Sequence, residues 1–100
     1  MASRKISWTR TAAKQFEAAI SYIALDSVYN AEKVAEKILK ELDKTIKNPE
    51  HFPPDKYKKN NNGTYRAFEK YRYRIAYRFT NDFVIRVLKI IHTSREPKMY

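Results

Sequence analysis

The sequence predicts an α+β domain in which one short strand and a helical hairpin precede three antiparallel strands. Apolar residues recur twice at helical spacing before residue 48, and they alternate at strand spacing after residue 64. Helices that are grouped before the main part of a sheet are typical of α+β domains. We therefore expect one domain over residues 1–100, with an antiparallel hairpin packed on a mostly antiparallel, twisted sheet.

The first strand is predicted at residues 5–9, where two apolar residues are spaced by two. A helix follows, because Thr9 or Thr11 can accept a hydrogen bond from a free amide of its first turn. This helix is expected to run to about Leu25. One side of it carries an apolar stripe, formed by Ala12, Phe16, Ala19, Ile20 and Ile23.

A second helix is predicted to start between Ser27 and Asn30 and to end at about Lys47. Its apolar residues recur three and four positions apart, while Lys and Glu occupy the opposite side. The link between the two helices is short, so they should form an antiparallel hairpin.

Prolines and a turn cluster dominate the next segment, residues 48–63. The prolines at 49, 53 and 54 prevent further helix, and three asparagines precede Gly63. Three lysines give this segment positive charge without a fixed geometry. A flexible, solvated loop is favoured over a defined binding site.

Three strands are predicted at residues 64–69, 72–80 and 83–91, with a tight turn at Asn81 and Asp82. The middle strand alternates most strictly, so its side chains should divide between two faces. Tyr73, Ile75, Tyr77 and Phe79 would form the core face, and Arg72, Arg74, Ala76 and Arg78 the exposed face. Three arginines on one face repel one another, and a bound anion would explain their presence.

The net charge of +10 belongs mostly to the second half of the chain. Residues 1–50 hold nine Lys and Arg against seven Asp and Glu, whereas residues 51–100 hold twelve against four. Such asymmetry indicates a polyanionic partner, either nucleic acid, an acidic protein or, less favoured, a membrane surface. A merely soluble basic surface is the plain alternative.

Several kinds of site are excluded by composition. The chain has no cysteine, which rules out disulfides, thiolate catalysis and cysteine-ligated zinc. One glycine cannot build a glycine-rich phosphate loop, and two distant histidines make a poor metal site. No apolar run approaches the roughly 20 residues of a membrane span. We expect no metal, no cofactor and no membrane partner, in a soluble and cytoplasmic protein.

Four segments together resemble a known family: Asn30 with Ala31, Asn48 with Pro49, TYRAFEKYRYRIAYRF at residues 64–79, and VIRVLKIIHTSREP at residues 84–97. In this order and at this length, the chain resembles the RelE/ParE superfamily of toxins from bacterial type II toxin–antitoxin modules. The resemblance implies a compact toxin that is neutralised by an antitoxin, whose acidic segment wraps its basic groove.

Two modes of action are implied by this resemblance. RelE-like toxins enter the ribosomal A site and cleave mRNA, whereas ParE-like toxins poison DNA gyrase and have no known hydrolytic site. The helical hairpin and the segment IIHTS look like ParE, but the charge and the tail look like RelE. The positive charge favours mRNA cleavage on the ribosome, and gyrase binding through the hairpin and tail is the alternative. A degenerate member that only binds antitoxin is a third possibility.

The resemblance also implies residue roles. Arg66, Arg74, Arg95 and Tyr100 match basic and tyrosine positions of RelE-like sites, but Phe68 stands where those toxins have a second lysine. Cleavage through a 2′-hydroxyl needs a base, an acid and positive charge around the phosphate. Arginines stay protonated, so Tyr100 or His92 would have to move the proton. The catalytic candidates are Arg66, Arg74, His92, Arg95 and Tyr100, and the RNA-binding candidates are Lys70, Arg72 and Arg78.

Each candidate has a structural alternative. His92 ends an apolar strand, where a histidine more often caps or packs than catalyses. Tyr100 is as readily a frayed end as a site residue. Tyr71, Tyr73 and Tyr77 are favoured as core and sheet surface over a base-stacking platform.

Overall fold

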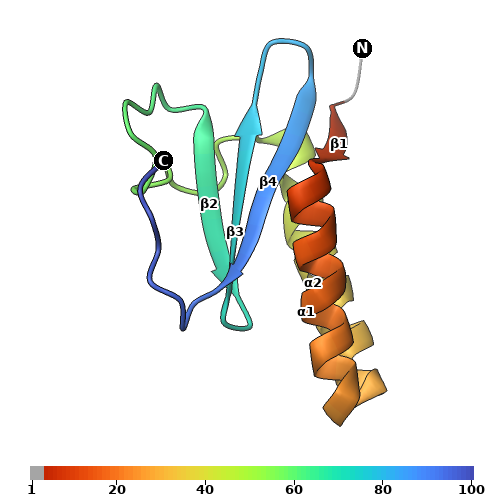
Figure 1. Cartoon of the computed structure of the whole chain (residues 1–100). Helices are drawn as coiled ribbons and strands as arrows, with labels where there is room; N and C mark the ends of the chain where they lie inside the picture. Colours follow the sequence, from red (N-terminus) through yellow and green to blue (C-terminus); the bar gives the residue numbers. More distant parts are fainter. Residues whose placement is uncertain (1–3) are drawn as a thin grey trace.

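The computed structural model describes residues 4–100, which form one strand, two helices and three further strands in that order (Figure 1). The elements match the predicted order, with ends that differ by one or two residues. They are β1 (Lys5–Trp8), α1 (Arg10–Asp26), α2 (Val28–Lys47), β2 (Tyr65–Lys70), β3 (Tyr73–Phe79) and β4 (Val84–His92).

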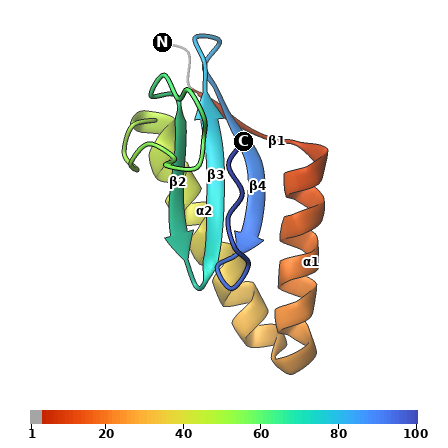
Figure 2. The same cartoon turned by 60° about the vertical axis from the view of Figure 1, so that its left-hand side comes forward.

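The four strands form one mixed sheet in the order β1-β4-β3-β2. β2, β3 and β4 are antiparallel neighbours, whereas β1 pairs in parallel with β4. The two helices connect β1 to the rest of the sheet and lie against one of its faces (Figures 1 and 2). The predicted α+β architecture is confirmed.

Two hydroxyl side chains fix where the helices begin. The Thr9 hydroxyl accepts a hydrogen bond from the Ala12 amide at 3.0 Å and donates one to the Leu88 carbonyl at 3.1 Å, which ties the start of α1 to β4. The Ser27 hydroxyl accepts from the Asn30 amide at 3.1 Å, and the Ser27 amide bonds to Ile23 at the end of α1. One residue therefore ends one helix and caps the next, which produces the antiparallel hairpin.

The core lies between the helices and the inner face of the sheet. Ile38 and Leu42 of α2 are buried there against apolar residues of the two central strands, including Ile75, Ile85 and Val87. Tyr77 is fully buried as well, and its hydroxyl donates to the Pro49 carbonyl at 2.6 Å. Burial raises the pKa of Tyr77 to about 12, so the phenol stays neutral in the core.

One predicted strand residue lies in a turn instead. Arg72 was expected on the exposed face of β3, but β3 begins at Tyr73. Tyr71 and Arg72 have φ angles of +51° and +67° and form the two-residue connection from β2. Positive φ at both central positions is the requirement of a type I′ hairpin turn, so Arg72 belongs to the turn and not to the strand.

The loop 48–63 is packed against the sheet, which contradicts the expectation of a flexible, solvated segment. The Phe52 ring stacks on Phe68 of β2 at a centroid distance of 4.3 Å. Asp55 is 2% exposed, and Asn61 donates to the carbonyls of Asp55 and Tyr65. Aromatic packing and these hydrogen bonds give the loop a defined path.

Residues 93–100 turn back along the outer face of the sheet (Figure 2). The Tyr100 amide donates to the Tyr57 carbonyl at 3.0 Å, and the Lys59 amide donates to the Tyr100 carbonyl at 2.7 Å. This C-terminal tail covers part of the face that was expected to be fully exposed. Within residues 4–100, no helix has the length and apolar character that crossing a membrane requires.

Candidate functional site

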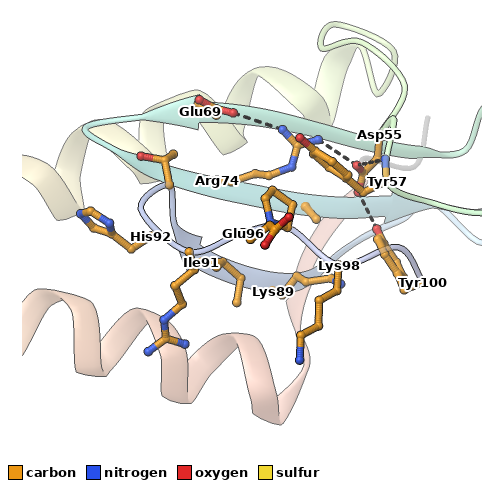
Figure 3. A pocket seen from close by; sticks show the side chains of 14 residues that line it. Asp55, Tyr57, Glu69, Arg74, Lys89, Ile91, His92, Glu96, Lys98 and Tyr100 are labelled. Atoms are coloured by element: carbon orange, nitrogen blue, oxygen red, sulfur yellow. Dashed lines mark hydrogen bonds and ion pairs between the residues drawn. The ribbon is translucent and has the colours of Figure 1, made fainter.

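The tail and the outer face of the sheet enclose a pocket of about 760 Å³ (Figure 3). β3 contributes Arg74, β4 contributes Lys89, and the tail contributes Arg95 and Tyr100. Asp55 enters from the loop before β2. Segments that are far apart in the sequence thus bring acids, bases and a phenol to one place.

Asp55 makes the central contacts of this pocket. Its carboxylate accepts from Arg74 Nη2 at 2.8 Å, from the Tyr100 hydroxyl at 2.6 Å and from the Tyr57 amide at 3.0 Å. Burial alone would raise the pKa of Asp55, but the hydrogen bonds from Tyr100, Arg74 and Tyr57 outweigh it and lower the pKa. Asp55 is therefore a firmly ionised carboxylate whose oxygens are already engaged.

Arg74 is neutralised on both sides. Besides Asp55, its guanidinium contacts the Glu69 carboxylate at 3.3 Å and lies over the Tyr57 ring at 4.7 Å. Only 16% of its side chain is exposed. Since two carboxylates occupy its donors, Arg74 has little capacity left for a phosphate.

Tyr100 is held in place by hydrogen bonds and is not a frayed chain end, which was the structural alternative for this residue. Burial and then the hydrogen bond to the Asp55 carboxylate raise its pKa above the ordinary value for tyrosine. Lys89 Nζ lies 3.4 Å from the Tyr100 ring centroid, and burial lowers the pKa of this lysine. The phenol is consequently a hydrogen-bond donor at neutral pH and a poor general base.

Arg66 lies on the other face of the sheet. Arg66 of β2 pairs with Tyr77 of β3, whose side chain points into the core. Arg66 therefore does not line the pocket. Its Nε donates to the Gly63 carbonyl at 2.8 Å and its Nη1 to the Phe52 carbonyl at 3.1 Å. The structure thus separates Arg66 from Arg74, although both were expected in one cluster. Phe68 was the available signal, because an apolar residue two positions away shares the face of Arg66.

His92 sits at the far end of the pocket and points away from the Asp55 group (Figure 3). Its Nδ1 is 2.7 Å from the Ser94 hydroxyl and accepts from the Ser94 amide at 3.0 Å. Its ring packs edge-on against Tyr73 at 5.1 Å. These contacts fit the structural role, capping and packing, that was the alternative to catalysis for His92.

The other candidates do not share a surface. Arg95 lines the pocket from the exposed tail. Lys70 lies on the helix side of β2, with Nζ 4.0 Å from Glu41, and Arg72 lies in the turn. Arg78 is exposed on the outer face, beyond the pocket. Among residues 4–100, no group of three or more His, Asp or Glu side chains is arranged to hold a metal.

Comparison with known proteins decides the family. The family model described as ParE toxin of type II toxin-antitoxin system, parDE, matches residues 6–97. The chain belongs to the ParE toxin family. It is thus the toxin of a type II toxin–antitoxin module, with an antitoxin as partner.

A solved structure titled Chromosomal ParDE TA system from P. aeruginosa has the same fold as this ParE-family chain. The TM-score is 0.66 and the identity is 18%, over 89% of this chain and 95% of that chain. No curated protein matches.

This ParE-family toxin has a second surface, an exposed apolar patch that was not predicted from the sequence. The tip of the helical hairpin extends beyond the sheet (Figure 1). Around Ser27, four apolar or aromatic side chains are exposed there: Tyr22, Leu25, Val28 and Tyr29. The two tyrosines are 72% and 73% exposed and Leu25 is 86% exposed. We call these four residues the hairpin tip.

Proposed function

We propose that this ParE-family toxin inhibits growth by binding DNA gyrase, and that it does not cleave mRNA. The hairpin tip carries this proposal. Apolar and aromatic side chains that gather on a protruding element are typical of a protein–protein contact and are otherwise unfavourable in water. Tyrosine and leucine at such a tip can enter a pocket on a large partner.

The pocket under the tail supports a non-enzymatic toxin. A free tyrosine is about one thousandth ionised at pH 7, and the environment of Tyr100 raises its pKa further. Arg74 is held by two carboxylates, and Arg66 lies on the opposite face. Tyr100 is thus a poor base, and Arg66 and Arg74 form no free cluster of cations around a phosphate. His92, the other candidate base, points away from this group and is bonded to Ser94.

The deciding experiment runs two assays on the same purified protein. One maps mRNA ends in a cell-free translation system, and the other measures DNA supercoiling by gyrase. We expect blocked supercoiling and intact mRNA. New mRNA ends at ribosome-occupied codons, with normal supercoiling, would overturn the proposal. The pocket under the tail would then be the candidate RNase site.

Variants of the hairpin tip assign the contact. The double change Leu25→Ala and Tyr29→Ala should raise the concentration needed for half-inhibition by about 30-fold, because loss of a central apolar anchor costs about 2 kcal/mol. Leu39→Ala is the matched control, since Leu39 is an exposed apolar residue of α2 outside the tip. His92→Gln should also leave inhibition unchanged. Equal inhibition by the tip variant and its control would show that gyrase is contacted elsewhere.

A further inference from the structure

A row of paired residues crosses the outer face of the sheet at the end near the β3–β4 turn. Tyr65 of β2 pairs with Arg78 of β3, which pairs with Arg86 of β4, which pairs with Ser7 of β1. Both arginines are exposed. They stand directly opposite each other on neighbouring strands, an arrangement in which like charges destabilise a sheet.

In the part of the chain that the structure describes, no carboxylate forms an ion pair with these arginines as Asp55 does with Arg74. The pKa of the nearby Asp82 is lowered mainly by its hydrogen bond from Thr80, and the charge of Arg86 is one of the smaller causes. Within residues 4–100, neither Arg78 nor Arg86 has an Asp or Glu oxygen within 4.0 Å. Together with Thr80 and Asp82 they line a shallow hollow of about 270 Å³. Asp82 accepts a hydrogen bond from Thr80 and is the one acid in that lining. The two guanidiniums therefore keep most of their donors free.

Further positive charge surrounds the arginine pair. The Arg78 guanidinium lies 5.0 Å over the Tyr65 ring, and Lys58 Nζ lies 4.7 Å from the same ring centroid. Lys5 pairs with Val84, two residues before Arg86, so it shares the outer face. Basic side chains interleaved with an aromatic ring on an open strand surface are typical of contacts with a nucleic-acid backbone.

We propose that Arg78 and Arg86 together bind a backbone phosphate of duplex DNA, namely the DNA that gyrase holds, so this inference rests on the proposed function. Neighbouring strands lie about 4.8 Å apart, which lets two guanidiniums reach one anion between them. A carboxylate has two oxygens, and a single arginine can bind both of them. A phosphate has more oxygens and can bind Arg78 and Arg86 at the same time. The geometry thus favours a phosphate over an acidic protein segment.

The test measures fluorescence anisotropy of a labelled DNA duplex with purified toxin, at salt concentrations from about 50 to 200 mM. Arg78→Gln with Arg86→Gln should bind at least about tenfold more weakly than wild type. The slope of log affinity against log salt should fall by about one, since the two arginines share one phosphate contact. Lys14→Gln with Lys33→Gln is the control, because it removes the same charge from exposed lysines of the helices.

A second readout separates lost binding from lost folding. Removing two opposed like charges should keep or raise the melting temperature, so weaker binding would accompany an unharmed fold. The proposal fails if the arginine variant and the control bind DNA equally. It also fails if wild type binds a matched RNA duplex but not the DNA duplex. A third contrary result would be that the arginine variant binds DNA like wild type and has lost affinity only for the antitoxin. No gyrase is present, so this result is independent of the supercoiling result.

Discussion

Asp55 follows two prolines in a loop, yet its carboxylate binds a strand and the C-terminal tail at once. Arg74 and Tyr100 reach it from positions 19 and 45 residues further along the chain. It is 2% exposed, and each of its oxygens accepts a hydrogen bond. A buried carboxylate with this many donors has a structural role, because its removal would leave Arg74 and Tyr100 without their main partner.

The change Asp55→Asn should lower the free energy of unfolding by about 3 kcal/mol, since breaking a buried ion pair strands the remaining charge. The measurement is denaturant unfolding at neutral pH. Asp43→Asn, at an exposed position of α2, is the control and should be close to wild type.

Acid unfolding provides the second half of this prediction. The pKa of Asp55 is lowered in the folded protein, so its stabilisation is present above the ordinary carboxyl pKa of about 3.9 and is lost as the pH falls through the folded value. Stability of the Asn variant should therefore decline less than that of wild type below about pH 4. Parallel curves for the two proteins would contradict the assignment.

At the scale of elements, the helices and strands follow from local sequence, whereas the site does not. Thr9 and the residues around Ser27 could be placed because a cap acts over three or four positions. The pairing of Asp55 with Arg74 and Tyr100 depends on how loop and tail fold over the sheet, and no local pattern encodes that. Arg66 was misplaced relative to Arg74 because its match to a family pattern outweighed the alternation with Phe68.

The turn between β2 and β3 is an element whose sequence does not suit its backbone. Tyr71 and Arg72 both have positive φ, a conformation that glycine and asparagine adopt more easily. Replacing the pair by Asn-Gly should stabilise the protein by about 1 kcal/mol and raise the melting temperature by about 4–8 °C. Calorimetry measures this directly. The reversed pair Gly-Asn is the control, and a lower melting temperature for Asn-Gly than for wild type would show that Tyr71 stabilises the turn.

For the molecule as a whole, the charge of +10 is unevenly distributed over the surface. Asp55, Glu69 and Glu96 offset the cations of the pocket under the tail, whereas the end of the sheet at Arg78 and Arg86 has little acidic compensation. An acidic antitoxin, as the family resemblance implies, would gain affinity from this excess. The complex should then weaken as salt is added, because exposed charges are screened beyond about 8 to 10 Å at physiological ionic strength.

Titration calorimetry of toxin and antitoxin at low and high salt tests that expectation. Unchanged affinity would indicate apolar anchoring instead, for which the hairpin tip is the available surface. The Leu25→Ala and Tyr29→Ala variant then separates the two, since it retains every charge.

β1 pairs in parallel with β4, so residues 5–8 pair with residues 84–87. A ribosome makes β1 before the two helices and makes its partner β4 after them. During synthesis, the apolar sides of β1 and the helical hairpin therefore stay partly uncovered until β4 has been made. The four-stranded sheet consequently assembles only once β4 is available, because β4 joins β1 to β3.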